Sequence, residues 1–597
     1  MVGQPRPEAT FPTWRTDIAD LFAAPFWVTP ARRADVAGQW LGCMKDYAVD
    51  LSDYDSVKAW SIRIYQYLHS REMPLTDDET QKWPDDALEL FRLWVNQGWR
   101  RDAADPFDRD ERIPQPRPRP APLRLRRDLR SLSQAELDDY RMRFEDAFQV
   151  ADAAPDAPGQ VFFSIHGDWC LHYQEAFLLW HRAYLMALEQ RLGCAVPYWN
   201  WYAQDAAVDG SPSAGLPQAF KDTTYVHPVT GEVRPNPLRF AAAKGGSSKA
   251  CAAGGPPSPG VDCRWVQRDP LLYTEGDDQR AARTRKIGLT LQYQLQVQRA
   301  LRFKDFSHPQ GVGYPWANIQ SFAPPPPDSQ YVYRDYNFDG AYEQPHDNYH
   351  GWVGPDMADN AYTAFDPVFW SYHANIDRIF EIWLRANATG ATFTANYPLH
   401  PFAGAHVERF EFTDPRGFVY TTIGDLAKDC RGLGYDFAAP IDPDFGTGAT
   451  VTRSAPAEDA DELLVLFDDV RCTLDSYAID VFLDAGPDQL TPDGRNDRYV
   501  GRLSRIGMGQ ADDKGRCIVK GVRRMLDASA TARALGLKPG DMPALTLVVT
   551  DLATGQAVPA ADQDKLPGFK GQLLWAKAGW APRAPSAPSP ASVSCCS

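Results

Sequence analysis

The sequence predicts a mainly α protein with an N-terminal helical extension, a helical core and a C-terminal antiparallel β domain. Three observations support this fold class. Helical apolar patterns recur up to about residue 384, a proline-rich run interrupts them, and the pattern changes beyond about residue 455. There, segments such as LLVLFDDV and ALTLVVTDLATG alternate with turn residues, as short antiparallel strands do. The length of 597 residues is enough for two to four domains.

The N-terminal extension, residues 1–113, contains one clear helix in WPDDALELFRLWVNQG. Pro84 and the two aspartates after it are typical of a helix start, and Gly98 is typical of a helix end. Leu88, Phe91 and Val95 form the apolar stripe between them. We interpret this extension as a helical packing module.

Prolines at positions 114, 116, 118, 120 and 122 predict an extended linker over residues 114–122. Beyond it we expect a core at 123–440, where the capping box from Ser133 to Glu136 begins the first helix. A β domain at 456–565 follows. The last segment, 566–597, ends in PRAPSAPSPASVSCCS, and its composition predicts a flexible tail.

Composition and charge exclude several classes of protein. The hydrophobic content of 44% and charged content of 23% are typical of a globular protein, and the net charge of -16 argues against nucleic-acid or anionic-membrane partners. No run of 18 apolar residues predicts a transmembrane helix, and no secretory signal is visible. We therefore expect a cytoplasmic location. The ten cysteines are dispersed, so we expect free thiols, with pairing of Cys251 and Cys263 as the less favoured alternative.

Six of the eleven histidines fall into two groups of three, which are His166, His172 and His181, and then His346, His350 and His373. In HDNYH the two histidines are four residues apart, so on a helix both rings project from one face. The last histidine of each group lies within a helical pattern, at 174–191 and 366–384. A single apolar-face histidine is usually a core residue, but burying six imidazoles without partners costs several kcal/mol. We predict that both groups bind metal.

The residues alone leave the metal open. Imidazole ligands suit copper, zinc, iron or nickel, and a three-ligand site keeps a position open for substrate. Two separate zinc sites are one alternative to a site that holds two metal ions together. A zinc hydrolase is disfavoured, because neither HExxH nor GxSxG occurs in the chain.

The stretches IHG, CLH, FLLWHRAYL and PYWNW, followed by YEQPHDNYHGWVG and FDPVFWSYHANIDR, closely resemble the type-3 copper proteins: tyrosinases, catechol oxidases and other polyphenol oxidases. The resemblance spans about residues 125 to 436. The C-terminal segment is similar to the small β domain of plant-type polyphenol oxidases, so the whole chain resembles a bacterial-looking member with a plant-type C-terminal domain. The resemblance implies a four-helix bundle that holds two copper ions, with O2 as co-substrate.

Carried over by position, the resemblance implies that His166, His172 and His181 bind the first copper, and that His346, His350 and His373 bind the second. Cys170 in Cys-Leu-His matches the Cys-x-His of fungal tyrosinases, where the sulfur is joined to the histidine as a thioether; a buried free thiol is the alternative. Glu343 matches the acidic residue that holds a water near the second copper. We expect it to help remove the phenol proton, with a solvated loop glutamate as the alternative.

Three departures from the family pattern affect the site. The gap between His166 and His172 is short, which implies a trimmed loop. Asp347 stands where many monophenol-hydroxylating members have asparagine, and it could act as a base or weaken the arrangement of Glu343 and water. Asn360 or Ala361 occupies the pocket position where plant catechol oxidases often place a bulky aromatic residue. That substitution favours monophenol access, so the balance between hydroxylase and oxidase activity stays open.

We therefore predict a tyrosinase or catechol oxidase-type oxidoreductase. It would use copper and O2 to hydroxylate monophenols at the ortho position and to oxidise o-diphenols to o-quinones. The alternatives are an o-aminophenol oxidase on the same scaffold and a haemocyanin-like oxygen carrier, which closed access to the site would favour. The expected partner is a small phenolic substrate, with no nucleic acid and no membrane, and a homo-oligomer is left open.

Overall fold

The computed structural model divides the chain into two compact units, Met1–Ala121 and Pro122–Ser597, and the division falls at the end of the proline-rich segment. Each unit is described by itself. The structure describes residues 11–45, 49–69, 73–108 except 75 and 77, 112–113, 123–306 except 171, 173–176, 256, 274, 275 and 305, 338–387, 401–402, 423–438, 461–507 except 471, 472 and 474, 522–559, and 571–577.

The first unit packs its helices around aromatic side chains. Its described α-helices are α1 (Ala19–Ala23), α2 (Arg33–Lys45), α3 (Tyr54–His69) and α4 (Asp85–Asn96). The helix predicted from WPDDALELFRLWVNQG is α4, with Pro84 at its N-cap and Gly98 in the left-handed region just beyond it. Phe91 on its buried face contacts Phe22 and Trp83, at ring-centroid distances of 5.9 and 6.1 Å. The apolar stripe therefore forms the core of this unit, as expected.

The helical core of the second unit confirms the predicted fold class. Its described α-helices are α5 (Gln134–Phe148), α6 (Pro158–Trp169), α7 (Phe177–Leu192), α8 (Lys249–Ala252), α9 (Arg280–Gly288), α10 (Thr290–Ala300), α11 (Phe338–Val353), α12 (Val368–Ala386) and α14 (Ile423–Leu426). The capping box of Ser133 and Glu136 begins α5. Helices α6, α7, α11 and α12 form the bundle that carries the histidines. Two short strand pairs accompany them: β1 (Arg124–Arg126) with β4 (Tyr435–Phe437), and β2 (Thr224–Val226) with β3 (Val233–Pro235).

Buried ion pairs join the helices of the bundle. Arg182 on α7 donates to Asp377 on α12 at 2.6 Å, and Arg126 on β1 donates to the same carboxylate at 2.7 Å. The two arginines and Asp377 are 3% exposed or less. Such groups are tolerated in a core only when they are paired. Asp377 is therefore an ion-paired structural residue of the bundle.

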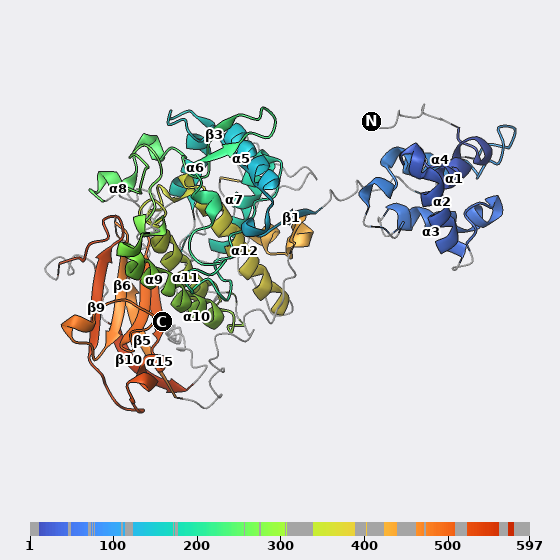
Figure 1. The fold of residues 1–597 in the computed structure, drawn as a ribbon. Coiled ribbons are helices and arrows are strands. Elements are labelled where there is room, and N and C mark those ends of the chain that lie inside the picture. The colour runs from blue at the N-terminus through green and yellow to red at the C-terminus, as the bar shows by residue number, and fades with distance from the viewer. Residues whose placement is uncertain are drawn as a thin grey trace, which may run out of the picture. The chain divides into compact units, whose positions relative to one another are not determined.

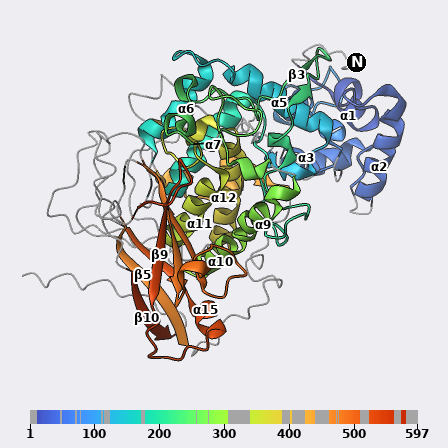
Figure 2. The ribbon, with the colours of Figure 1, turned by 60° about the vertical axis from the view of Figure 1, so that its left-hand side comes forward.

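The C-terminal β domain consists of two antiparallel three-stranded sheets, ordered β10-β5-β8 and β7-β6-β9. The strands are β5 (Asp461–Val470), β6 (Tyr477–Leu483), β7 (Tyr499–Arg505), β8 (Val522–Asp527), β9 (Leu545–Asp551) and β10 (Gly571–Lys577), and a short helix, α15 (Ser529–Ala534), follows β8. Alternate side chains such as Leu463, Val465 and Ile479 fill the space between the sheets. In both views this domain lies beside α10 and α11 (Figure 1 and Figure 2).

Strand β10 corrects the predicted boundary of the C-terminal tail. The sequence assigns all of 566–597 to a flexible tail, but Gly571–Lys577 pairs with β5 along its whole length. Leu573 and Trp575 pack against the core between the sheets. The strand was missed because its apolar residues are adjacent to a Pro- and Ser-rich end, whose composition dominated the prediction. The two cysteines at 595 and 596 lie outside the described residues.

Cys251 and Cys263 form a disulfide, which corrects the expectation of free thiols at these positions. The bond closes a short loop that begins at α8. Disulfides persist mainly in oxidising compartments, so the bond does not support the predicted reducing cytoplasm. Separately, none of the helices in the described part of the chain is long and apolar enough to cross a membrane.

Candidate metal centre

The first group of histidines comes from α6, α7 and the connection between them. His166 lies in the last turn of α6, which ends at Trp169, and His181 projects from the second turn of α7. Their Nε2 atoms are 3.1 Å apart. The ring of His172 lies 5.5 Å from that of His166 and 5.1 Å from that of His181, measured between centroids. The three imidazoles therefore surround one point.

The second group comes from α11 and α12. His346 and His350 are one turn apart on α11, as their spacing predicts, and His373 projects from α12. The three Nε2 atoms form a triangle with sides of 2.9, 3.3 and 3.4 Å. The two groups adjoin, because the rings of His181 and His373 stack at 4.5 Å. The bundle thus brings together all six histidines that the sequence singles out.

Backbone carbonyls fix the orientation of several imidazoles. The Nδ1 atoms of His166, His181 and His350 lie 2.9, 2.8 and 2.7 Å from the carbonyl oxygens of Asn360, Phe177 and Met357. A carbonyl only accepts, so Nδ1 carries the proton and Nε2 presents its lone pair to the shared point. This is the outer-sphere arrangement that metal-binding histidines require.

Burial keeps these histidines neutral. It lowers the pKa of His181 to about 3 and that of His350 to about 4, although their carbonyl partners act in the opposite direction. Burial and the neighbouring histidines also hold the pKa values of His172, His346 and His373 well below the usual range. Neutral imidazole is the form that binds metal, so at neutral pH no proton has to leave before a metal binds.

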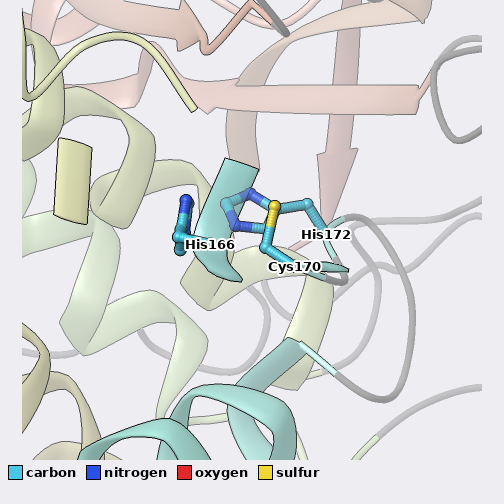
Figure 3. A group of neighbouring side chains, drawn as sticks. All are labelled: His166, Cys170 and His172. Carbon is cyan, nitrogen blue, oxygen red and sulfur yellow. The ribbon is translucent and has the colours of Figure 1, made fainter. Parts of the chain in front are cut away.

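Cys170 and Glu343 both lie close to His172. The nitrogen and sulfur atoms of His166, Cys170 and His172 lie within 4.8 Å of one another, and Figure 3 shows the sulfur of Cys170 against the ring of His172. Glu343 on α11 places Oε1 3.8 Å from Nδ1 of His172. Its side chain is fully buried in the helix, so it is not a solvated loop residue.

Asp347 links the histidine site to the β domain. One oxygen of its carboxylate is 3.0 Å from Nδ1 of His346, and the other accepts from Arg524 of β8 at 3.3 Å. Arg505 of β7 is buried as well, and its charge lowers the pKa of His172. Neither arginine is predicted from the sequence. No spacing connects them to the histidines, and they are two of 62 basic residues in the chain.

Comparisons with known proteins agree with this geometry. Residues 142–386 match the family model described as the common central domain of tyrosinase. A tyrosinase of Hahella sp., HcTyr2, is 22% identical over 48% of this chain and 60% of that protein. The G-type haemocyanin of Enteroctopus dofleini is 25% identical over 44% of this chain, but only 8% of that protein is covered.

Residues 142–386 are a type-3 copper domain of the tyrosinase family. An oxygen-bound variant of Aspergillus oryzae pro-tyrosinase shares the fold, with a TM-score of 0.50, 16% identity, and coverage of 76% of this chain and 92% of that one. The chain spans less than two thirds of the length of the curated relatives named above.

The donor set fits the two coppers that this family implies. Each group offers three neutral imidazoles at one point, and copper accepts all-imidazole ligation. The Glu-x-x-His pattern of di-iron bundles occurs on α11, at Glu343 and His346, but such bundles carry it on two helices. Here the Oε1 atom of Glu343 instead faces His172 across 3.8 Å. The arrangement therefore matches a binuclear copper centre better than a di-iron centre.

The two candidate pocket residues of this type-3 domain lie beside His166. The backbone of Asn360 accepts from His166 and donates to Gly507, which lies just beyond β7. Ala361 is 7% exposed, and its Cα lies 3.0 Å from the place where Gly167 would carry a Cβ. The backbone of this segment therefore connects the first histidine group to the β domain.

Proposed function

We propose that this chain holds two copper ions and uses O2 to oxidise small phenolic substrates, by ortho-hydroxylation of monophenols and by conversion of o-diphenols to o-quinones. The observation that supports this best is the pair of converging histidine triplets, in which contacts at Nδ1 orient four of the six rings. His166, His172 and His181 would hold one copper, and His346, His350 and His373 the other. Bound copper supplies the capacity to bind O2 and to take two electrons from the substrate.

The protein's own groups would position and deprotonate the substrate. Glu343 is the proton acceptor in this proposal, because it is fully buried and its Oε1 lies 3.8 Å from Nδ1 of the ligand His172. Both carboxylate oxygens of Asp347 have a partner, one in His346 and the other in Arg524. These contacts support a role for Asp347 in positioning the ring of His346. The apolar walls, to which Phe369 contributes between the triplets, would exclude water from the reaction.

We also propose a thioether between Cys170 and the ring of His172. The sulfur lies against that ring, and Cys170 is 3% exposed, which protects it from competing oxidants. The link would fix the orientation of the His172 ring. A tryptic peptide that contains both residues should be lighter by the mass of two hydrogen atoms after copper loading in air, and unchanged in the Cys170→Ala variant.

A reversible oxygen carrier is the second candidate. Its support is the closed environment of the site, since His166, His346 and His350 are 1% exposed or less and the β domain contacts α11 through Asp347. A haemocyanin is among the relatives. Closure of this kind limits access by a phenol but not by O2.

One experiment separates the candidates. The protein is loaded with copper, reduced and exposed to O2 while its near-ultraviolet absorption is recorded, and then given tyrosine, catechol and o-aminophenol in separate reactions. The proposal predicts a new absorption band and oxidation of catechol. A band without turnover of any substrate would favour the carrier, and turnover of o-aminophenol alone would favour an aminophenol oxidase. Retention of zinc with no band would refute the copper assignment.

A further inference from the structure

A cavity lies between the helical core and the β domain. Its volume is about 390 Å³, within the range of small-molecule sites. One wall comes from α10 and α11, through residues such as Leu295, Arg299 and Gln344. The other comes from the β domain, through residues such as Glu462 of β5 and Met525 of β8. None of the histidines lines it, so it is distinct from the copper site.

The walls of this cavity contain buried polar atoms that lack hydrogen bonds. Gln344 is 3% exposed and Glu462 is 4% exposed. Nε2 of Gln344, Nε of Arg299 and Oε2 of Glu462 have no hydrogen-bond partner within the described residues. Oε2 of Glu462 lies 3.8 Å from Nη2 of Arg299, which is longer than a hydrogen bond, whereas Nη1 of Arg299 donates to Asp527 at 3.1 Å. Each buried polar atom that makes no hydrogen bond lowers the stability of the folded protein by about 1–3 kcal/mol. A ligand that offered both an acceptor and donors would satisfy these atoms.

The charges around the cavity are balanced. Three arginines and three carboxylates line it: Arg299, Arg302, Arg533, Glu462, Asp497 and Asp527. Equal numbers of each sign favour a ligand that carries both charges over a simple anion or cation. Guanidinium groups bind carboxylates through paired hydrogen bonds, and Glu462 can accept from an ammonium group.

The uncharged lining is mixed: Gln292, Gln298 and Asn496 are polar, and an apolar wall is formed by Leu295, Phe303, Val500, Met525 and Leu526. We propose that the cavity binds a zwitterionic α-amino acid with an aromatic or other apolar side chain. Its carboxylate would accept from Arg299 and Gln344, its ammonium would donate to Glu462, and its side chain would contact the apolar wall. Because both domains supply the walls, the bound amino acid would stabilise the contact between them.

Titration calorimetry of the metal-free, full-length chain with L-phenylalanine tests this proposal. L-phenylalanine has no phenolic hydroxyl, so it is not a substrate of the proposed oxidation, and copper is not needed for the measurement. We expect one site, and binding at least about tenfold weaker in Arg299→Met and in Glu462→Gln. Arg495→Gln is the matched control, because Arg495 is 71% exposed and pairs with Asp493 outside the cavity. It should bind as the wild type does.

Two further experiments test where the amino acid binds and whether both of its charges are needed. Ala530→Trp fills the cavity from α15 without removing a charge, and it should abolish binding while the far-ultraviolet spectrum is unchanged. 3-Phenylpropionate and phenethylamine each lack one charge, and each should bind at least about tenfold more weakly than L-phenylalanine. The proposal is overturned if L-phenylalanine does not bind, if every variant binds it equally, or if 3-phenylpropionate binds as tightly. None of these outcomes depends on the copper chemistry, which is tested separately.

Discussion

The atoms around His350 determine which of its ring nitrogens carries the proton and which can bind metal. Nδ1 lies 2.7 Å from the carbonyl oxygen of Met357 and 3.1 Å from the hydroxyl of Thr363, while Nε2 faces His346 and His373. The carbonyl requires a proton on Nδ1, so the lone pair of Nε2 is free for metal. This makes His350 the residue at which ligand chemistry and folding are most clearly separable.

His350→Ala should therefore lower catechol oxidation at least about 100-fold and leave the fold intact, because a ligand is lost but no ion pair is broken. Thr363→Val is the graded comparison, since it removes only a hydrogen bond to the other nitrogen, and we expect a loss of about tenfold or less. Steady-state oxidation of catechol measures both effects, and thermal melting confirms folding. Normal turnover by His350→Ala would show that the ligand assignment is wrong.

At this scale the sequence predicted the histidines because their spacing and flanking residues carry the signal. The i and i+4 positions of His346 and His350 specify a shared helical face. Arg505 and Arg524 carry no such signal, because strands bring them to the site from more than 130 residues beyond His373. The disulfide of Cys251 and Cys263 was also undecidable, since a loop of 12 residues permits a bond without requiring it.

At the scale of elements, the end of α11 depends on a glycine. Gly354 has a φ of +130°, and an added Cβ would lie 2.3 Å from the backbone nitrogen of Asp269. Its own amide donates to His350 at 3.3 Å. Only glycine lets the chain turn so close to another backbone. The geometry of the second histidine group therefore depends on Gly354, which is not itself a proposed metal ligand.

Gly354→Ala should destabilise the protein by about 2–4 kcal/mol, since the backbone of Asp269 cannot move aside cheaply. Gly288→Ala is the control at the end of α9, where an added Cβ meets nothing within 4 Å. Alanine there should be neutral or stabilise the helix by up to about 1 kcal/mol. The midpoints of urea unfolding measure both changes. Equal midpoints for the two variants would contradict the steric argument.

The segment after α11 should make stability depend on pH. Burial raises the pKa of Asp356 to about 7, against hydrogen bonds from Gln267, Ser248 and Lys249 that lower it. Between about pH 4 and 7 the folded chain keeps a proton that the unfolded chain has released, so this contribution to stability falls as pH rises. Relative to Asp356→Asn, the wild type should lose about 1.4 kcal/mol per pH unit across the middle of this window. Urea unfolding at several pH values measures the difference, and parallel curves would refute it.

Elements were predictable where a periodic pattern stood between clear end signals. The helix of Leu88, Phe91 and Val95 and the helix that begins after Ser133 are present as predicted. Helix α12 begins at Val368, although Asp366 still accepts from the amide of that residue. Strand β10 was missed because its short apolar run adjoins a Pro- and Ser-rich segment, and its partner β5, which would have marked it as a strand, lies about 100 residues earlier.

At the scale of the molecule, buried charges join the β domain to the helical bundle that carries the six histidines. Asp347 and Arg524 are fully buried, 3.3 Å apart, and come from different domains. Removing one member of such a pair leaves an uncompensated charge and costs about 3–5 kcal/mol. The exposed pair of Lys577 and Asp461 in the same β domain should contribute less than about 1 kcal/mol.

Arg524→Met should therefore loosen the contact between the domains, and amide hydrogen exchange in α11 and β8 should become faster, whereas Lys577→Met should leave it unchanged. The double variant Asp347→Asn with Arg524→Met should recover much of the protection, because no buried charge is then left unpaired. Hydrogen exchange of the metal-free chain separates this structural effect from any effect on turnover. If Arg524→Met exchanges at the wild-type rate in both elements, the ion pair does not hold the β domain to the site. Faster exchange in the double variant than in either single variant would instead show that the two residues contribute independently.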